Sequence, residues 1–497
     1  MNRSTTILSL IAIATATSMV FLDVTIIPVA LPTIVKELRI SQTDAQWIIN
    51  SYLLAVATLV FVGGKLGDFW GHRKILCIGL LVFAIASAIG GMATSGHWLI
   101  ISRSIQGVGG AMMGPAALSL IIDTFPEHLR GRYLGIVVGF SSLFLTLGPF
   151  IGGAFTQFFS WRWLFWINLP IAITGTTLAL IFIPRSKRVK VSFDLIGTFT
   201  FCGALITLVL ALMQGKSWGW TSRGVIALFG LSLLFTSILV ITELKAKKPF
   251  FDRKLFSIRR FCGGNLVILL TQFLLTMTIF WAIYFQETLD YTPMQAGSMT
   301  LFATFPLLIF APMAGHLVDR FGPRLPMAIG FILMTFGLIW FFFFLNQGEA
   351  LLIVPSLLTF GAGIALVMTP NSTATLSSVP EGKRGEASGI YNTMRYVGAT
   401  LGVAVLGALV TNLGHFLFVR GLDQLAASRG VNPQQFAQLT TEMHPSMVEI
   451  ESPFRSEVIA TYLRANYFSY SIATLFAALI SVIALVITFV YFKNKKR

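Results

Sequence analysis

The sequence predicts an all-α polytopic membrane protein, and three observations support this. Of its 497 residues 55% are apolar and only 11% are charged, against about 25% charged residues in a soluble domain. Apolar runs of about 20 residues, long enough to cross a bilayer as helices, recur along the whole chain. Basic residues cluster in alternate loops, as the positive-inside rule describes. The net charge of +16 therefore indicates a lipid bilayer as the partner and no nucleic acid.

Length and apolarity predict about fourteen membrane-spanning helices. If the N-terminus is cytoplasmic, the inner loops and tails hold about 25 Lys and Arg residues and the outer ones about 9. We therefore expect a multi-pass protein of the cell (inner) membrane with both termini in the cytoplasm. The expected spans are 7–31, 45–66, 75–94, 98–123, 133–157, 164–183, 195–213, 224–242, 262–286, 296–317, 326–345, 351–377, 388–411 and 466–492.

The rest of the chain contains one long polar segment and few reactive groups. The outer segment 412–465 carries three prolines and only weak helical patterning, which leaves both an ordered external cap and a mobile loop open. The cysteines Cys77, Cys202 and Cys262 fall in or beside apolar spans, and we interpret them as packed thiols. No metal-ligand spacing appears, and we expect no cofactor.

A loop sequence occurs twice, once after the second expected helix and once after the tenth. GKLGDFWGHRK and GHLVDRFGPR share residues at the same relative positions, namely Gly64, Asp68, Gly71 and Arg73 in the first, and Gly315, Asp319, Gly322 and Arg324 in the second. Self-similar halves are how many secondary transporters are built, with the substrate site at the midplane between them. We therefore expect an N-terminal six-helix half at 1–184, two inserted helices and a basic linker at 185–255, and a C-terminal six-helix half at 256–497.

Further motifs lie on the expected helices in a fixed order. They are LDVTIIPVALP at 22–32, RSIQGVGGA at 103–111, GPFIGG at 148–153, WRWLFWINLP at 161–170 and YTPMQAG at 291–297. With the repeated loop, they resemble the major facilitator superfamily and, within it, the fourteen-helix drug:proton antiporter group. The resemblance covers nearly the whole chain apart from 412–465. One departure is Pro28, where that group commonly has Asn.

The resemblance implies the major facilitator fold, with two six-helix bundles and two inserted helices. It also implies a proton-coupled exporter (an antiporter) of amphipathic small molecules that works by alternating access. In an envelope with an outer membrane, it implies cooperation with a periplasmic adaptor and an outer-membrane channel. The repeated loop then acts as a latch that biases the outward-open state, although short basic inner loops are expected from topology alone.

Asp23 is the acid that we expect to bind the transported proton. A charge near the bilayer centre costs roughly 2.5–3.5 kcal/mol, so an acid inside the first span is informative. Asp23 and Arg103 fall at similar depth on helices of opposite direction, and intramembrane charges usually pair. Pro28 and Pro32 are expected to weaken the helix just beyond the acid. The alternative is a fixed ion pair that clamps the two helices together.

Small and polar residues provide the remaining candidates. Gly148, Pro149, Gly152 and Gly153 on the fifth helix are expected either to form a hinge or to be ordinary small-residue packing. Arg395 is the third intramembrane charge, with either a substrate contact or a structural network as its role. The polar and aromatic residues that are candidates for a substrate cavity, together with Arg395, are Asn50, Gln106, Gln272, Trp281 and Gln286.

Other functions fit the sequence less well. A dedicated exporter of one metabolite, such as a siderophore or fatty acid, would use the same scaffold, and the motifs do not separate it from a multidrug exporter. A polytopic enzyme would need clustered acids or histidines, but the six His residues are scattered and no HExxH motif occurs. One intramembrane acid against two arginines favours a neutral, monocationic or anionic amphiphile over a dication.

Overall fold

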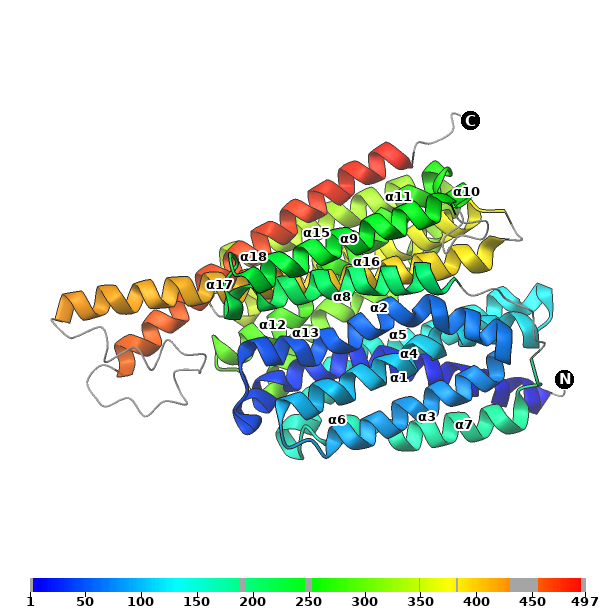
Figure 1. Ribbon diagram of the computed structural model, residues 1–497, viewed down its shortest axis with the longest axis horizontal. Helices are drawn as coiled ribbons and strands as arrows, with labels where there is room; N and C mark the ends of the chain where they lie inside the picture. Colours follow the sequence, from blue (N-terminus) through cyan, green and yellow to red (C-terminus); the bar gives the residue numbers. More distant parts are fainter. Residues whose placement is uncertain are drawn as a thin grey trace.

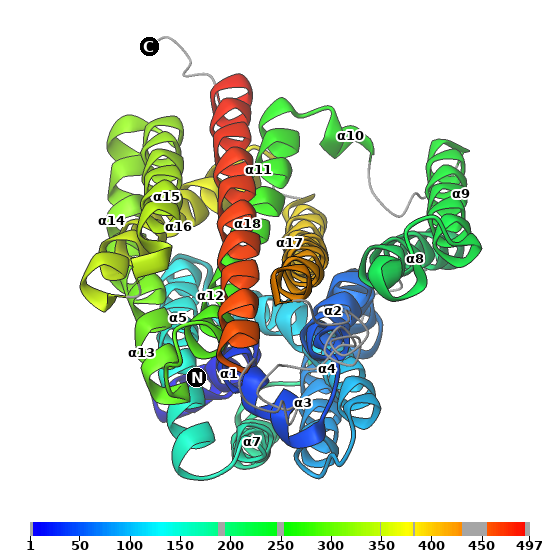
Figure 2. The ribbon, with the colours of Figure 1, turned by 90° about the vertical axis from the view of Figure 1, so that its left-hand side faces the viewer.

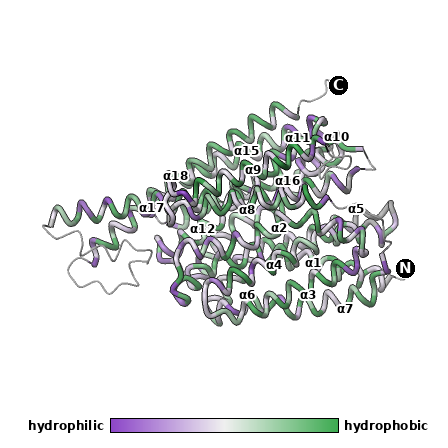
Figure 3. Tube along the Cα trace, viewed as in Figure 1, coloured by the Kyte–Doolittle hydropathy of each residue, from purple (hydrophilic) through white to green (hydrophobic). Residues whose placement is uncertain are grey.

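The computed structural model describes residues 3–186, 194–245, 253–347, 349–380, 383–429 and 455–492. Within these ranges the chain is almost entirely helical and contains no strand. Fourteen segments of the described chain are long and apolar enough to cross a membrane, which confirms the predicted fold class. Hydrophobic residues run along the bundle and hydrophilic ones gather towards its two ends (Figure 3).

The helices form two sets with a pair between them in sequence. The N-terminal half comprises α1 (Arg3–Leu38), α2 (Gln42–Trp70), α3 (His72–Gly91), α4 (Gly96–Thr124), α5 (Glu127–Phe158), α6 (Trp163–Trp166) and α7 (Asn168–Phe182). The intervening pair is α8 (Leu195–Trp218) and α9 (Arg223–Lys245). The C-terminal half comprises α10 (Arg253–Phe256), α11 (Arg259–Leu275), α12 (Met277–Glu287), α13 (Pro293–Thr304), α14 (Pro306–Phe321), α15 (Arg324–Phe344), the 3₁₀ helix η1 (Leu345–Gln347), α16 (Ala350–Ser377), α17 (Arg384–Arg429) and α18 (Arg455–Tyr491).

Helix α1 begins and α18 ends on the same side of the bundle, which we call the terminal face (Figure 1). The opposite side is the distal face. Each half has its own apolar core, and the two halves meet through α5 against α13, α2 against α17 and α1 against α12. In Figure 1 the ribbons of the two halves converge at the distal face and diverge towards the terminal face.

Three of the spans are built from two consecutive α-helices, namely α6 with α7, α11 with α12, and α13 with α14. The span made of α13 and α14 breaks before Pro306, which has no N–H to continue the helical hydrogen bonding. The span made of α11 and α12 breaks at Thr276, whose hydroxyl donates to the carbonyl of Phe273 at 2.6 Å. Helix α1, in contrast, continues through Pro28 and Pro32 as one helix to Leu38, so the expected weakening of the helix there does not break it.

The repeated loop folds in the same way in both halves. Gly71 ends α2 with φ +99°, and Gly322 ends α14 with φ +74°. Each glycine donates its N–H to the carbonyl four residues earlier, at 2.8 Å in both cases. Only glycine adopts such backbone angles at low cost, which explains why the loop has glycine at this position in both halves.

A second pair of turns also matches, although the sequence comparison did not identify it. Arg39 between α1 and α2 has φ +50°, and Asp290 between α12 and α13 has φ +56°. Two residues later, Ser41 and Thr292 each cap the following helix in a capping box. Equivalent turns on both sides of the second helix of each half extend the internal repeat beyond the loop motif.

The pair α8–α9 lies at the edge of the bundle (Figure 2). Helix α8 packs against both halves through a small apolar cluster formed by Leu54, Ala57, Leu205, Val209, Met213, Val397 and Ala404. The pair therefore covers the place where α2 and α17 meet.

The expected outer segment 412–465 is helical at both of its ends. Helix α17 continues to Arg429 and α18 begins at Arg455, and the two form a hairpin beyond the distal end of the bundle (Figure 1). Phe418 and Leu422 of α17 pack against Val458 of α18. The two α17 residues are four positions apart, as expected for one face of a helix. The surrounding segment is polar, so this spacing gave only a weak helical pattern. Residues 430–454 lie outside the described part of the chain.

Candidate functional site

An ion pair joins Asp23 of α1 to Arg103 of α4 inside the N-terminal half. Nη1 of Arg103 lies 2.5 Å from Oδ2 of Asp23, and both residues are 1% exposed. The similar depth predicted from the sequence thus corresponds to a direct contact. Because both charges are buried, removal of either one would leave the other unpaired in an apolar interior.

Neighbouring polar groups form further hydrogen bonds with Asp23 and Arg103. Gln106 donates from Nε2 to Oδ1 of Asp23 at 3.0 Å and to Oγ of Ser87 at 2.8 Å. Arg103 donates to Oε1 of Gln106 at 2.6 Å and from Nε to the carbonyl of Ile48 at 3.1 Å. Both carboxylate oxygens of Asp23 are therefore engaged. Gln106, which we expected in a substrate cavity, belongs to this cluster.

Tyr52 completes the surroundings of the cluster. The guanidinium of Arg103 lies 4.4 Å from the centre of the Tyr52 ring, and the ring is fully buried. A cation over an aromatic face is favourable when both are shielded from water. We call the group of Asp23, Arg103, Gln106 and Tyr52 the charge cluster.

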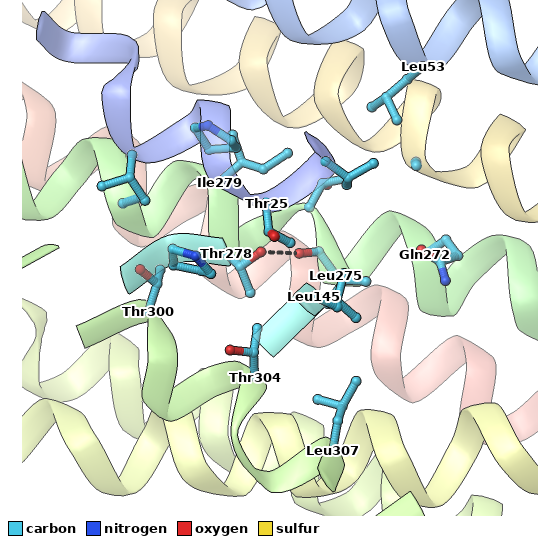
Figure 4. Close-up of a pocket in the computed structure, with 17 residues that line it drawn as sticks. Thr25, Leu53, Leu145, Gln272, Leu275, Thr278, Ile279, Thr300, Thr304 and Leu307 are labelled. Atoms are coloured by element: carbon cyan, nitrogen blue, oxygen red, sulfur yellow. Dashed lines mark hydrogen bonds between the residues drawn. The ribbon is translucent and has the colours of Figure 1, made fainter. Parts of the chain in front are cut away.

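A cavity of about 50 Å³ lies between the halves next to the charge cluster, because its lining residues Val24 and Thr25 directly follow Asp23. This volume suits a few water molecules and is too small for a drug-sized compound. Figure 4 shows its lining residues. They are Val24, Thr25, Pro28, Val29, Leu53, Leu145, Pro149, Gln272, Leu275, Thr276, Thr278, Ile279, Ala282, Thr300, Thr304, Leu307 and Ala399.

The cavity lining is apolar apart from threonine hydroxyls and one amide. Thr278 donates its hydroxyl to the carbonyl of Leu275 at 2.8 Å (Figure 4). Gln272 is 5% exposed, and its Nε2 has no hydrogen-bond partner among the described residues. Gln272 is the residue of our six cavity candidates that lines this space.

The other cavity candidates lie elsewhere. Asn50 is buried and donates to the sulfur of Met213 on α8 at 2.9 Å. Trp281 is packed inside the C-terminal half against the rings of Phe341 and Phe360, each 4.9 Å away. In this structure the Trp281 ring is therefore enclosed by its own half, and its place in a substrate cavity stays a prediction.

Gln286 and Arg395 both reach across to the N-terminal half. Gln286 donates from Nε2 to the carbonyl of Val29 on α1 at 2.8 Å. The guanidinium of Arg395 lies 5.0 Å from the Phe21 ring on α1 and 5.8 Å from the ring of Tyr396. Each contact joins a C-terminal helix to the helix that carries Asp23.

The small residues of α5 form a close seam with α13 on the distal side. A Cβ on Gly153 would collide with the carbonyl oxygen of Pro293, and a Cβ on Gly297 would collide with that of Pro149. Each glycine therefore allows a backbone carbonyl of the opposite half to approach closely. We call the contact formed by Pro149, Gly153, Pro293 and Gly297 the distal seam. The backbones of α5 and α13 can approach this closely because the two glycines have no side chain.

A neighbouring face of α5 packs against α1. A Cβ on Gly152 would lie 2.5 Å from the carbonyl oxygen of Ile26, and one on Gly148 would collide with the hydroxyl of Thr25. By contrast, a Cβ on Gly139, nearer the terminal face, would meet no atom within 4 Å. The tight packing of α5 is thus confined to its distal part.

The first copy of the loop motif makes contacts within its own half. Asp68 faces Nε2 of His72 at 3.2 Å. Arg73 donates to the carbonyls of Leu180 and Ile183 at the end of α7. A Cβ on Gly64 would lie 3.5 Å from Cβ of Pro115 on α4, an ordinary van der Waals contact.

In the second copy, the Arg324 guanidinium lies 4.7 Å from the Phe489 ring. The side chain of Asp319 lies outside the described part of the structure. Among the described side chains, no ion pair of this motif joins the two halves.

Sequence reasoning missed several contacts between the halves. Thr146 on α5 and Thr304 on α13 exchange hydrogen bonds through hydroxyl and carbonyl, at 3.3 and 3.2 Å. Glu287 accepts from Nε2 of Gln42 at 3.0 Å near the distal face. Threonines give no distinctive signal in apolar helices, and Glu287 falls just beyond the expected span 262–286.

No group of three His, Cys, Asp or Glu side chains in the described residues could hold a metal ion. The site is therefore defined by a buried acid, its cationic partner and an apolar cavity between the halves.

Comparisons with known proteins agree with this architecture. Residues 13–403 match the family model described as Major Facilitator Superfamily. The chain is 33% identical over 421 residues to the "Multidrug resistance protein Stp" of Mycobacterium tuberculosis (strain CDC 1551 / Oshkosh), covering 82% of this chain and 76% of that protein. It is 32% identical over 408 residues to the "Tetracenomycin C resistance and export protein" of Streptomyces glaucescens, covering 81% and 76%.

A solved structure shows the same fold at low sequence identity. It is a crystal structure of a bacterial homolog to the human lysosomal transporter Spinster, in an inward-facing and unoccupied conformation. The TM-score is 0.66 at 15% identity, over 99% of this chain and 98% of that one. Fold, family match and relatives together establish that this chain belongs to the Major Facilitator Superfamily of membrane transporters.

Proposed function

We propose that this protein is a proton-coupled exporter of amphipathic small molecules that works by alternating access. The observation that carries the proposal is the position of three consecutive residues in α1. Asp23 belongs to the charge cluster, while Val24 and Thr25 line the cavity. Thr25 also packs against Gly148 of α5. One helix thus links the candidate proton site, the cavity and the packing of α5.

Export also fits the relatives and the loop charges. The most similar relatives reported above carry names of multidrug resistance or export. We infer from the positive-inside rule that the terminal face is cytoplasmic and the distal face external. The distal seam then closes the outer side in this structure, while the halves diverge towards the cytoplasm, as an exporter that awaits its substrate requires.

The proposed cycle uses the charge cluster as the switch. A proton that reaches Asp23 neutralises the carboxylate and weakens its hold on Arg103, which frees α1 to move against α4. One proton that enters down 100 mV supplies about 2.3 kcal/mol, and one pH unit adds about 1.4 kcal/mol. Together these support a several-hundredfold gradient of a neutral substrate. In an envelope with an outer membrane, the distal hairpin of α17 and α18 would be the part that meets a periplasmic adaptor linked to an outer-membrane channel.

Proton release from energised inverted membrane vesicles tests the proposal. The vesicle interior is acidified and followed with a pH-quenched dye, and neutral, cationic and acidic aromatic drugs are added in turn. We expect wild type to release protons on addition of substrates and Asp23→Asn to release none. Asp290→Asn is the matched control, because this exposed acid lies in a turn whose positive φ asparagine tolerates.

The outcomes separate the candidate functions. Full proton release by Asp23→Asn would refute the role of Asp23. Release by wild type for one compound only would favour a dedicated exporter, a reading supported by the relative named for export of tetracenomycin C. Release for compounds of several scaffolds would support a multidrug exporter.

A further inference from the structure

Arg395 lies where the cavity approaches the terminal side of the molecule. It precedes Ala399, a lining residue, by one helical turn of α17, so the two share a face. Phe21, whose ring lies 5.0 Å from the Arg395 guanidinium, likewise precedes the lining residue Val24 by about one turn of α1. The guanidinium is therefore positioned between the halves, one turn from the cavity.

This cation has no counter-ion in the part of the chain that the structure describes. Its guanidinium makes ring contacts with Phe21 and Tyr396, but no ion pair and no hydrogen bond to any described residue. Asp23 is the nearest acid along the facing helix, and both of its oxygens are already engaged by Arg103 and Gln106. Because intramembrane charges usually pair, a lone arginine beside a cavity needs an explanation.

The other free polar atoms near the cavity include donors. The Nε2 of Gln272 and the hydroxyl of Tyr52 have no partner among the described residues. Tyr52 lies within electrostatic range of Arg395 and is fully buried. Tyr391 and Tyr396 are likewise within electrostatic range of Arg395, and no carboxylate of the described chain forms an ion pair with it. An unpaired guanidinium on Arg395 together with an unpartnered amide N–H on Gln272 favours a ligand with an anionic head group.

We infer that Arg395 binds the acidic head group of the substrate, a carboxylate or an acidic phenol carried by an apolar or aromatic body. The inference rests on the proposed export function and narrows its substrate class from amphiphiles in general to anionic ones. The apolar lining and the threonines accommodate the body, and the cavity widens when the distal seam or the cytoplasmic opening rearranges. Guanidinium suits carboxylates because its planar donors match them in pairs.

An anionic substrate has an electrical consequence for the transport cycle. Export of one anion combined with entry of one proton moves two positive charges inward. The inside-negative membrane potential therefore drives both steps in the same direction. A neutral substrate would move one charge and a monocation none, so the head group determines how strongly transport depends on the potential.

Binding of three matched probes to the full-length protein in nanodiscs tests the inference. The probes are 1-pyrenebutyrate, its methyl ester and the corresponding pyrenebutyl trimethylammonium ion, which share ring and chain but differ in head-group charge. We compare wild type, Arg395→Gln and Arg395→Lys. Arg259→Gln is the control, because Arg259 also lies over an aromatic ring, that of Tyr491, but belongs to an exposed region far from the cavity.

We expect wild type and Arg259→Gln to bind the carboxylate at least tenfold more tightly than the ester, and the cation most weakly. Arg395→Gln should lose this preference but keep its affinity for the ester, which shows that the fold is intact, and Arg395→Lys should keep part of the preference. Two results would overturn the inference: wild type that binds the carboxylate no more tightly than the ester, or an unchanged preference in Arg395→Gln. Arg395 would then have only a structural role, through its packing on Phe21. Neither result depends on proton release, so a failure of the export proposal is detected separately.

Discussion

The two halves of this transporter share their turns but differ in their interiors. Gly71 and Gly322 end equivalent helices at positive φ, and Arg39 and Asp290 occupy equivalent turns before capped helices. These features depend on backbone geometry. The interiors, in contrast, contain different chemistry at corresponding positions.

The difference is clear when positions are counted from the shared turns. Leu274 precedes Asp290 by as many residues as Asp23 precedes Arg39. Leu357 follows the N-cap of α16 as Arg103 follows the N-cap of α4. Leu274 and Leu357 are both fully buried, so the C-terminal half has leucines where the N-terminal half has its ion pair.

The C-terminal half is instead held by aromatic packing. Trp281 packs against Phe341 and Phe360 in an interior without a buried ion pair among its described residues. Replacing a buried ion pair by well-packed apolar residues is often neutral or stabilising. The charge cluster is therefore difficult to explain by stability alone, which supports its assignment to proton coupling in one half only.

The largest expected effect comes from converting one interior into the other. Arg103→Leu leaves Asp23 buried without its partner and should lower the free energy of unfolding by about 3–5 kcal/mol. The double variant Asp23→Leu/Arg103→Leu reproduces the apolar pair of the C-terminal half and should recover most of that loss. Reversible unfolding in mixed micelles measures both values.

In the same variants, proton release should not follow the free energy of unfolding. Neither Arg103→Leu nor the double variant should release protons from energised vesicles when substrate is added. A double variant that still couples transport to protons, or one as unstable as Arg103→Leu, would show that the charge cluster is not what distinguishes the halves.

The distal seam should respond equally to changes made from either side. Alanine at Gly153 or Gly297 forces a Cβ against a backbone carbonyl of the opposite half, and such overpacking costs about 1–3 kcal/mol. In the proposed alternating-access cycle the seam is present only while the distal side is closed, so both variants should shift the protein towards the distal-open state. Labelling from the outer side of a cysteine placed at Thr278 in the cavity measures that shift.

Gly139→Ala is the control for this pair, since a Cβ there meets no atom within 4 Å. It should leave labelling unchanged. Different responses at Gly153 and Gly297 would mean that one half dominates the closure of the distal side, contrary to the reciprocal geometry.

The sequence predicted the features that depend on whether a segment lies in the membrane and on its depth there. Hydropathy located all fourteen spans, and matching depth along two helices predicted that Asp23 and Arg103 could pair. It did not predict which side of an apolar helix faces a cavity, because core, cavity and lipid all favour apolar residues. For that reason the sequence could not separate Trp281, which packs in a core here, from cavity residues, and Thr25, Thr278 and Thr304 were not identified.

Contacts made after the ends of the expected spans were missed for a related reason. Polar composition suggested a loop after the thirteenth span, although Phe418 and Leu422 pair with α18 as a helical hairpin. The apolar residues of α17 have a packing partner only because α18, which is distant in sequence, places Val458 against them. Tertiary contacts of this kind lie outside what a local pattern records.

The smallest expected effect tests the shared turns. Gly71→Ala and Gly322→Ala each place a side chain at a positive-φ, extended-ψ backbone conformation that is essentially restricted to glycine, at a cost of about 1–3 kcal/mol. If the two halves are equivalent at their turns, the two losses in unfolding free energy should agree within error. Gly230→Ala on α9 is the matched control: it has open space around it and a helical backbone, so it should stabilise by about 0.5–1 kcal/mol. A loss at only one of the two turns would mean that the loop motif repeats in sequence but not in its need for glycine, whereas equal losses would show that the two halves share the backbone geometry of this turn.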